Sequence, residues 1–136
     1  MKKFPFITLR QSLIVFRVVV ALLLMAHGAM RLSAGTVNDF GDFLNSKGFM
    51  IGNVIAWFLT IFEMAGGLLM AAGYFVKWIA AVFMTEIVMG IILVHAKNGW
   101  FVVGHQSGGA EYSVLIIFSL IVIAATKKEN AGSIIK

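Results

Sequence analysis

The sequence predicts an all-α membrane protein: a bundle of four transmembrane helices with a short amphipathic helix in the first outer loop. Of its 136 residues, 60% are hydrophobic and only 12% are charged, whereas soluble domains are about half apolar and a quarter charged. The apolar residues gather in four segments, and most lysines and arginines lie between or beyond them. A chain this short keeps most residues near its surface, so a surface this apolar is stable only against lipid.

Four segments approach or exceed the roughly 17 to 25 apolar residues that a spanning helix needs. They cover residues 12–31, 51–74, 77–95 and 110–126. The last is short unless Glu111 and a few preceding residues join its helix, and Lys127 and Lys128 end it. The length allows one domain, so we expect residues 1–136 to form a single integral membrane domain.

A secretory signal peptide is the alternative interpretation of the first segment. Lys2 and Lys3 would form its basic region and Ile14–Met25 its apolar region. The apolar run is too long for a signal peptide, Arg17 interrupts it, and further apolar segments follow. The sequence therefore favours a first transmembrane helix.

The loops differ in character. The turn at residues 75–77 is so short that the second and third helices must be antiparallel neighbours. In the first outer loop, Phe40, Phe43 and Leu44 have the spacing of one helix face, which predicts a short interfacial amphipathic helix. The second outer loop is rich in glycine, which permits a folded-back backbone lining a protein cavity.

The distribution of lysine and arginine predicts the orientation of the protein in the membrane. With an even number of spans, one side of the membrane holds Lys2, Lys3, Arg10, Lys77, Lys127, Lys128 and Lys136. On the other side, Arg31, Lys47 and Lys97 are offset by Asp39, Asp42 and Glu111. The positive-inside rule then places both termini in the cytoplasm. Membrane topology thus explains the net charge of +5, and we expect no nucleic-acid partner.

Two glutamates lie deep in the predicted bundle. Glu63 is eleven residues before Tyr74, and Glu86 is nine residues after Lys77. Both are therefore about 13–17 Å from the cytoplasmic turn, near the bilayer midplane. Like charges at this depth repel, so at least one carboxyl should be protonated or paired with a cation. Arg17 on the first helix can reach toward Glu86, which makes it a candidate for a structural ion pair.

A polar cavity in the outer half of the bundle is the candidate ligand site. Its predicted lining residues are His27, Arg31, Glu63, Glu86, His95 and Glu111, with His105 and Gln106 from the glycine-rich loop. In this hypothesis the two midplane glutamates hold protons, and His27 and Arg31 donate hydrogen bonds to the ligand. Each residue also has a structural interpretation, as a packing histidine, a snorkelling arginine or a solvated loop residue.

Several chemistries lack support in the sequence. The absence of cysteine excludes disulfides, thiolate metal sites and iron–sulfur clusters. Phosphate loops, dinucleotide fingerprints and zinc-protease motifs are also missing. His27, His95 and His105 are separated without any metal-binding motif, so we predict no metal, and a haem site has the same weak basis.

Three groups of residues resemble the DoxX family of small bacterial membrane proteins. They are His27-Gly28 with Arg31, the run from Glu63-Met64-Ala65-Gly66-Gly67 to Leu69 followed by Gly73, and Gly108-Gly109-Ala110-Glu111-Tyr112. The resemblance covers residues 13–126 and implies a four-helix bundle in the bacterial inner membrane. Named members are subunits of quinol oxidase and thiosulfate:quinone oxidoreductase complexes, and others are linked to oxidative-stress and thiol-redox assemblies. The lack of cysteine here argues against a direct thiol relay.

Three functions follow from these observations. The first is a quinone-associated subunit of a membrane oxidoreductase, with another redox protein supplying electrons because the chain shows no electron-carrying cofactor site. If the chain is catalytic, it is part of such a quinone-using enzyme. The second is a scaffold or assembly factor for a redox complex, with polar groups joining the helices. The third is a small proton-coupled transporter, for which a homodimer is expected because four short helices are few.

Overall fold

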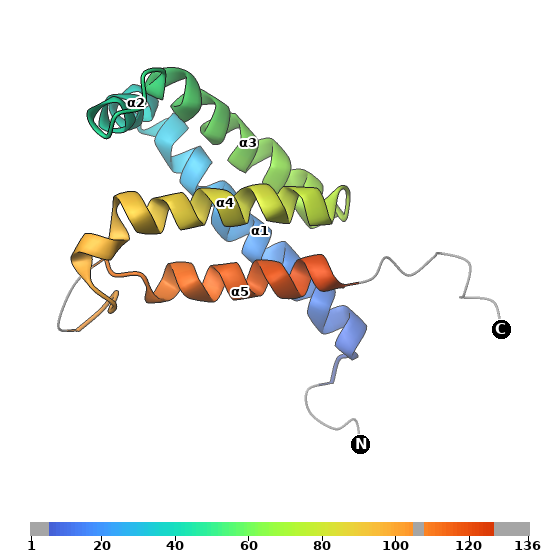
Figure 1. Cartoon of the computed structure of the whole chain (residues 1–136). Helices are drawn as coiled ribbons and strands as arrows, with labels where there is room; N and C mark the ends of the chain where they lie inside the picture. Colours follow the sequence, from blue (N-terminus) through green and yellow to red (C-terminus); the bar gives the residue numbers. More distant parts are fainter. Residues whose placement is uncertain (1–5, 105–107, 127–136) are drawn as a thin grey trace.

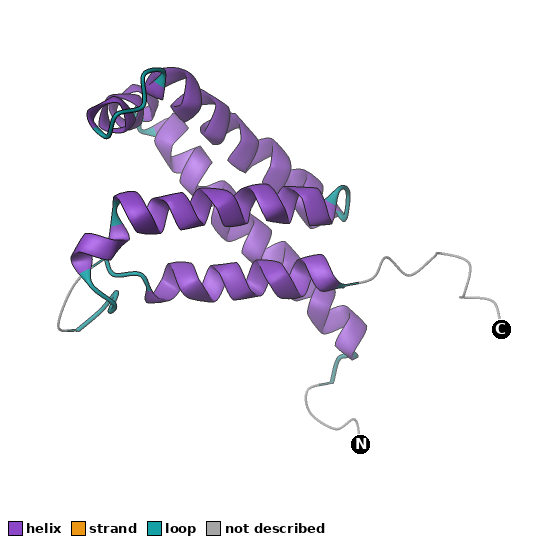
Figure 2. Cartoon of the chain, viewed as in Figure 1, coloured by secondary structure: helices purple, strands orange, loops and turns teal. Residues whose placement is uncertain are grey.

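The computed structural model describes residues 6–104 and 108–126, and this part of the chain is helical without strands (Figure 2). The helices are α1 (Leu9–Ser33), α2 (Val37–Ser46), α3 (Gly52–Ala72), α4 (Val76–Leu93) and α5 (Glu111–Ala125), with a 3₁₀ turn, η1, at His95–Asn98. The predicted all-α fold is confirmed, and so is the helix in the first outer loop.

Three of these helices, α1, α3 and α4, are long and apolar enough to cross a membrane. Helix α5 is equally apolar but has 15 residues, which corresponds to about 22 Å of helix. Glu111 joins it as expected, but the residues before Glu111 do not, because they form an irregular loop. Large apolar side chains such as Val54, Leu68 and Phe118, each more than 60% exposed, cover the outside, as expected of a lipid-facing surface.

Local sequence explains where the helices begin and end. Helix α1 begins at a capping box in which Thr8 Oγ1 accepts from the Gln11 amide and the Gln11 side chain accepts from the Thr8 amide. Helix α3 ends at Gly73, whose φ of 89° is left-handed and suits glycine. The chain then turns directly into α4, so the predicted tight turn between the two helices is confirmed.

The helices pack as two sets, one of α1, α2 and α3 and one of α4 and α5, and the two sets cross obliquely (Figure 1). Helix α1 packs mainly along α3, α2 lies on the start of α3, and α4 pairs with α5. Glycines allow the close α1–α3 contact: a Cβ at Gly28 would lie 2.8 Å from the Thr60 carbonyl oxygen, and one at Gly67 would overlap Met25 Cγ. Buried Met70, Phe83 and Leu120 belong to the core that joins α3, α4 and α5.

Candidate functional site

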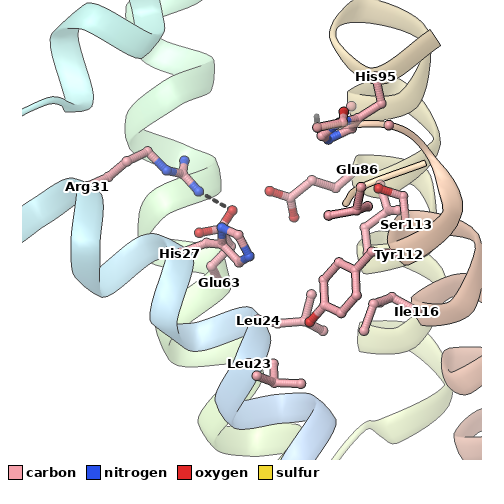
Figure 3. A pocket seen from close by; sticks show the side chains of 15 residues that line it. Leu23, Leu24, His27, Arg31, Glu63, Glu86, His95, Tyr112, Ser113 and Ile116 are labelled. Carbon is pink, nitrogen blue, oxygen red and sulfur yellow. Dashed lines mark hydrogen bonds and ion pairs between the residues drawn. The ribbon is translucent and has the colours of Figure 1, made fainter. Parts of the chain in front are cut away.

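A cavity of about 280 Å³ lies between the two sets of helices. Leu23, Leu24, His27 and Arg31 of α1 form one wall with Glu63 of α3 (Figure 3). The facing wall is formed by Glu86, Ile87 and Gly90 of α4, His95 of η1, Val102, Gly108 and Gly109 of the following loop, and Tyr112, Ser113 and Ile116 of α5. Most of this lining is apolar, and its polar groups face one another from separate elements.

Arg31 and Glu63 form an ion pair between α1 and α3, in which Arg31 Nη2 donates to Glu63 Oε1. The pair is shielded, since the two side chains are 18% and 6% exposed. Arg31 Nη1 also donates to Thr60 Oγ1 at 3.2 Å, and the guanidinium carbon lies 4.7 Å from the centre of the Phe40 ring. Three separate contacts therefore hold Arg31 in place, which favours a structural role as one partner of a buried ion pair and not as a snorkelling residue.

Glu86 projects from α4 toward the Arg31–Glu63 pair (Figure 3). Glu63 Oε2 and Glu86 Oε2 are both buried, and neither has a hydrogen-bond partner in the described part of the chain. One guanidinium thus faces two carboxyl groups. A proton would balance the remaining negative charge, and a hydrogen-bond donor on a ligand would satisfy an unpartnered oxygen.

The two described histidines differ in their bonding. The Nδ1 atom of His95 is 2.7 Å from the carbonyl oxygen of Gly108, so this contact fixes the His95 ring at the cavity edge. His27 is exposed and lines the cavity, and no hydrogen bond to another described residue holds its ring. Of the predicted ligand donors, His27 is therefore the one whose ring nitrogens are available.

Five of the six predicted ligand-site residues line this cavity: His27, Arg31, Glu63, Glu86 and His95. The sixth, Glu111, is not among the lining residues, because its Oε1 accepts from the Val102 amide at 3.1 Å. That bond holds the loop after η1 against the first turn of α5. Glu111 therefore positions the residues that line this wall of the cavity, although it does not line the cavity itself. His105 and Gln106 lie outside the described residues.

The expected pairing of Arg17 with a glutamate is wrong. Arg17 Nη2 instead donates to the Ala71 carbonyl oxygen at 3.4 Å, at the C-terminal end of α3, whereas Glu63 lies in the middle of that helix. The physical reason is side-chain direction, because residues on a helix lean toward its N-terminus. Arg17 therefore leans toward the turn between α3 and α4, whereas Arg31 leans back toward Glu63.

Tyr112 and Ser113 are cavity residues that the sequence analysis did not identify. They follow Glu111 directly in the first turn of α5, and Tyr112 and Ile116 are four residues apart on one face. That spacing is the signal that could have identified the wall. The Tyr112 ring lies across the cavity from Leu24 of α1, and its hydroxyl group can donate or accept (Figure 3).

The loop after η1 folds back as its glycines suggested. The amides of Gly109 and Glu111 donate to the carbonyl oxygens of Phe101 and Trp100 at 3.1 and 3.0 Å. A Cβ at Gly109 would lie 2.5 Å from the Trp100 carbonyl, so glycine permits this close approach. Within residues 6–104 and 108–126, no three histidine, aspartate or glutamate side chains gather as a metal site.

The fold and the cavity define a multi-pass helical membrane protein with a small, partly polar internal site. The DoxX family model matches residues 12–96, which is more than half of the chain. The chain therefore belongs to the DoxX family. Comparisons with curated proteins and with solved structures each returned no match.

Proposed function

We propose that this DoxX protein is a small membrane subunit of an oxidoreductase and that its cavity binds the head group of a lipid-soluble quinone. The observation that carries the proposal is that one largely apolar cavity holds both an available donor, His27, and a buried carboxyl oxygen of Glu86 that has no partner among the described residues. A quinone head group is flat and apolar, with two carbonyl oxygens that accept hydrogen bonds. The cavity is near the lower end of the sizes typical of small-molecule sites, about 300 Å³.

The polar groups suit the chemistry of quinone reduction, which adds two electrons and two protons to give a quinol. His27 and the Tyr112 hydroxyl group, on opposite walls, would donate hydrogen bonds to the carbonyl oxygens. Glu86 would hold and deliver one of the two protons, since one of its oxygens has no partner among the described residues. The electrons would come from a redox partner protein, and this chain would bind and orient the quinone.

A second cavity offers room for a hydrocarbon tail. It has a volume of about 310 Å³, and its lining includes apolar side chains of α2, α3 and α4 such as Phe43, Leu59 and Met89. Glu86 and Gly90 line both cavities. A Cβ at Gly90 would have nothing within 4 Å, so the α4 backbone leaves open space at this boundary. A ligand with a polar head and an apolar tail fits this arrangement.

A scaffold or assembly role is the second candidate, and the Arg31–Glu63 pair favours it. This ion pair is bonded within the protein and joins two helices, as expected of polar groups that hold a bundle together. The proposal also includes the bacterial inner membrane as location, with both termini in the cytoplasm. Reporter fusions at each terminus and at the α1–α3 connection would test that orientation.

The test is mass spectrometry and absorption spectroscopy of protein purified gently from its native membrane. We expect a co-purifying quinone, lost from His27→Ala and from Gly90→Leu, because the leucine would fill the open boundary between the cavities. Gly90→Ala is the matched control and should keep most of the quinone. A sample with one stoichiometric protein partner and no quinone would favour the scaffold. Proton-coupled solute uptake into vesicles, also without quinone, would favour the transporter.

A further inference from the structure

A separate cavity of about 350 Å³ lies at the opposite end of the bundle, at the turn between α3 and α4. Helix α1 contributes Arg17, the turn contributes Gly73 and Phe75, α4 contributes its first three residues, and Thr126 closes the end of α5. Figure 1 shows this turn beside the end of α5, away from α2 and η1. None of the described residues that line the cavity is acidic.

The Arg17 guanidinium has more N–H donors than the described residues around it offer acceptors. Its one bond to a described residue is the 3.4 Å contact with the Ala71 carbonyl oxygen, and its Nε is buried without a partner. The guanidinium lies against Gly73, where a Cβ would be 3.2 Å from Nη2. A guanidinium has five N–H donors, and leaving them unmatched near hydrocarbon is unfavourable.

Two further positive groups share the cavity. Lys77 is exposed, and no described acidic side chain pairs with it. Helix α4 begins here with no side-chain cap and no acidic residue in its first turn. The first amides of this 18-residue helix therefore add partial positive charge to the two side chains. All of these groups favour an anion with several acceptor oxygens.

The position of the cavity indicates where that anion comes from. Trp78 and Phe75 are 78% and 69% exposed beside it, and tryptophan is enriched at the level of lipid head groups. The cavity lies where three apolar helices, α1, α3 and α4, reach one end of the bundle. We propose that Arg17, Lys77 and the start of α4 bind the phosphate group of an anionic phospholipid.

The site is positively charged, so it should discriminate between classes of phospholipid. Phosphatidylglycerol and phosphatidylcholine both carry a phosphodiester, but the choline group of the second lipid is cationic. That group would be repelled by Lys77, so the site should prefer phosphatidylglycerol. The site is independent of the quinone proposal, because it shares no lining residue with the two cavities around Glu86.

Native mass spectrometry of the delipidated full chain in detergent tests the site by titration with each lipid. Arg17→Gln should weaken phosphatidylglycerol binding about tenfold or more, as expected for losing a charge-assisted hydrogen bond. Lys77→Gln should weaken it about fivefold. Lys97→Gln removes the same charge from η1, at the other end of the bundle, and should leave binding unchanged.

Equal binding of the two lipids, or equal phosphatidylglycerol binding by the wild type and Lys77→Gln, would overturn the proposal. The exposed Lys77 keeps the test valid if Arg17→Gln does not fold. A third arm adds inorganic phosphate without lipid. Tight binding of inorganic phosphate that depends on Arg17 and excludes phosphatidylglycerol would assign the site to a free anion and reject the lipid assignment.

Discussion

Breaking the ion pair between Arg31 and Glu63 should destabilise the bundle strongly. Arg31→Met keeps the length and apolar stem of the side chain but removes its charge. It loses a charge-assisted bond to Glu63, worth about 1.5–3 kcal/mol, and a bond to Thr60, worth about 0.5–1.5 kcal/mol. The contact with Phe40 adds about 0.5–1 kcal/mol. We expect a loss of about 3–5 kcal/mol, as for other buried pairs that lose one partner.

A double-mutant cycle separates the pair from its surroundings. Glu63→Leu should also destabilise the protein, because it leaves the Arg31 guanidinium without its carboxylate. The double variant Arg31→Met/Glu63→Leu replaces both charges with apolar groups. It should therefore be more stable than the two single losses together would predict, by about 2–3 kcal/mol, which is the upper part of the range for residues in contact.

The assay is reversible unfolding by SDS titration in mixed micelles, followed by tryptophan fluorescence, with helix content checked by circular dichroism. Trp57 on α3 is a suitable reporter because its indole donates to Asn38 of α2 at 3.1 Å. If the effects of the two single substitutions add to within about 0.5 kcal/mol, the pair does not couple α1 to α3. The reasoning about its structural role would then be refuted.

Three further substitutions test the packing around the cavity. Gly28→Ala should lower the free energy of unfolding by about 1–3 kcal/mol in the same titration, since its Cβ would lie 2.8 Å from the Thr60 carbonyl oxygen. An unchanged midpoint would contradict the close contact between α1 and α3. Gly90→Ala should raise stability by up to about 1 kcal/mol, because open space surrounds the new methyl group, and a lowered midpoint would argue against that space. Glu111→Ala removes the acceptor of the Val102 amide. It should speed hydrogen exchange at that amide with little change in global stability. Unchanged exchange would show that the bond is not formed.

The candidate site was predictable in part. His27, Glu63 and Glu86 could be identified because ionisable residues inside apolar helices are costly and usually face the interior. Tyr112 and Ser113 were missed because a tyrosine or serine at the start of a helix carries no such cost. Glu111 was assigned to the cavity from its place at the outer end of the last helix, and that place does not reveal that its carboxylate accepts from the backbone amide of Val102.

The sequence by itself determined which segments are helical and which face lipid, since run length, apolar content and glycine position are local properties. It also determined that α3 and α4 are adjacent, because the turn between them is too short for any other arrangement. Only the tertiary structure decided which arginine meets Glu63. Both Arg17 and Arg31 lie on α1, and the choice depends on the antiparallel packing of α1 on α3 and on the lean of each side chain toward the helix N-terminus.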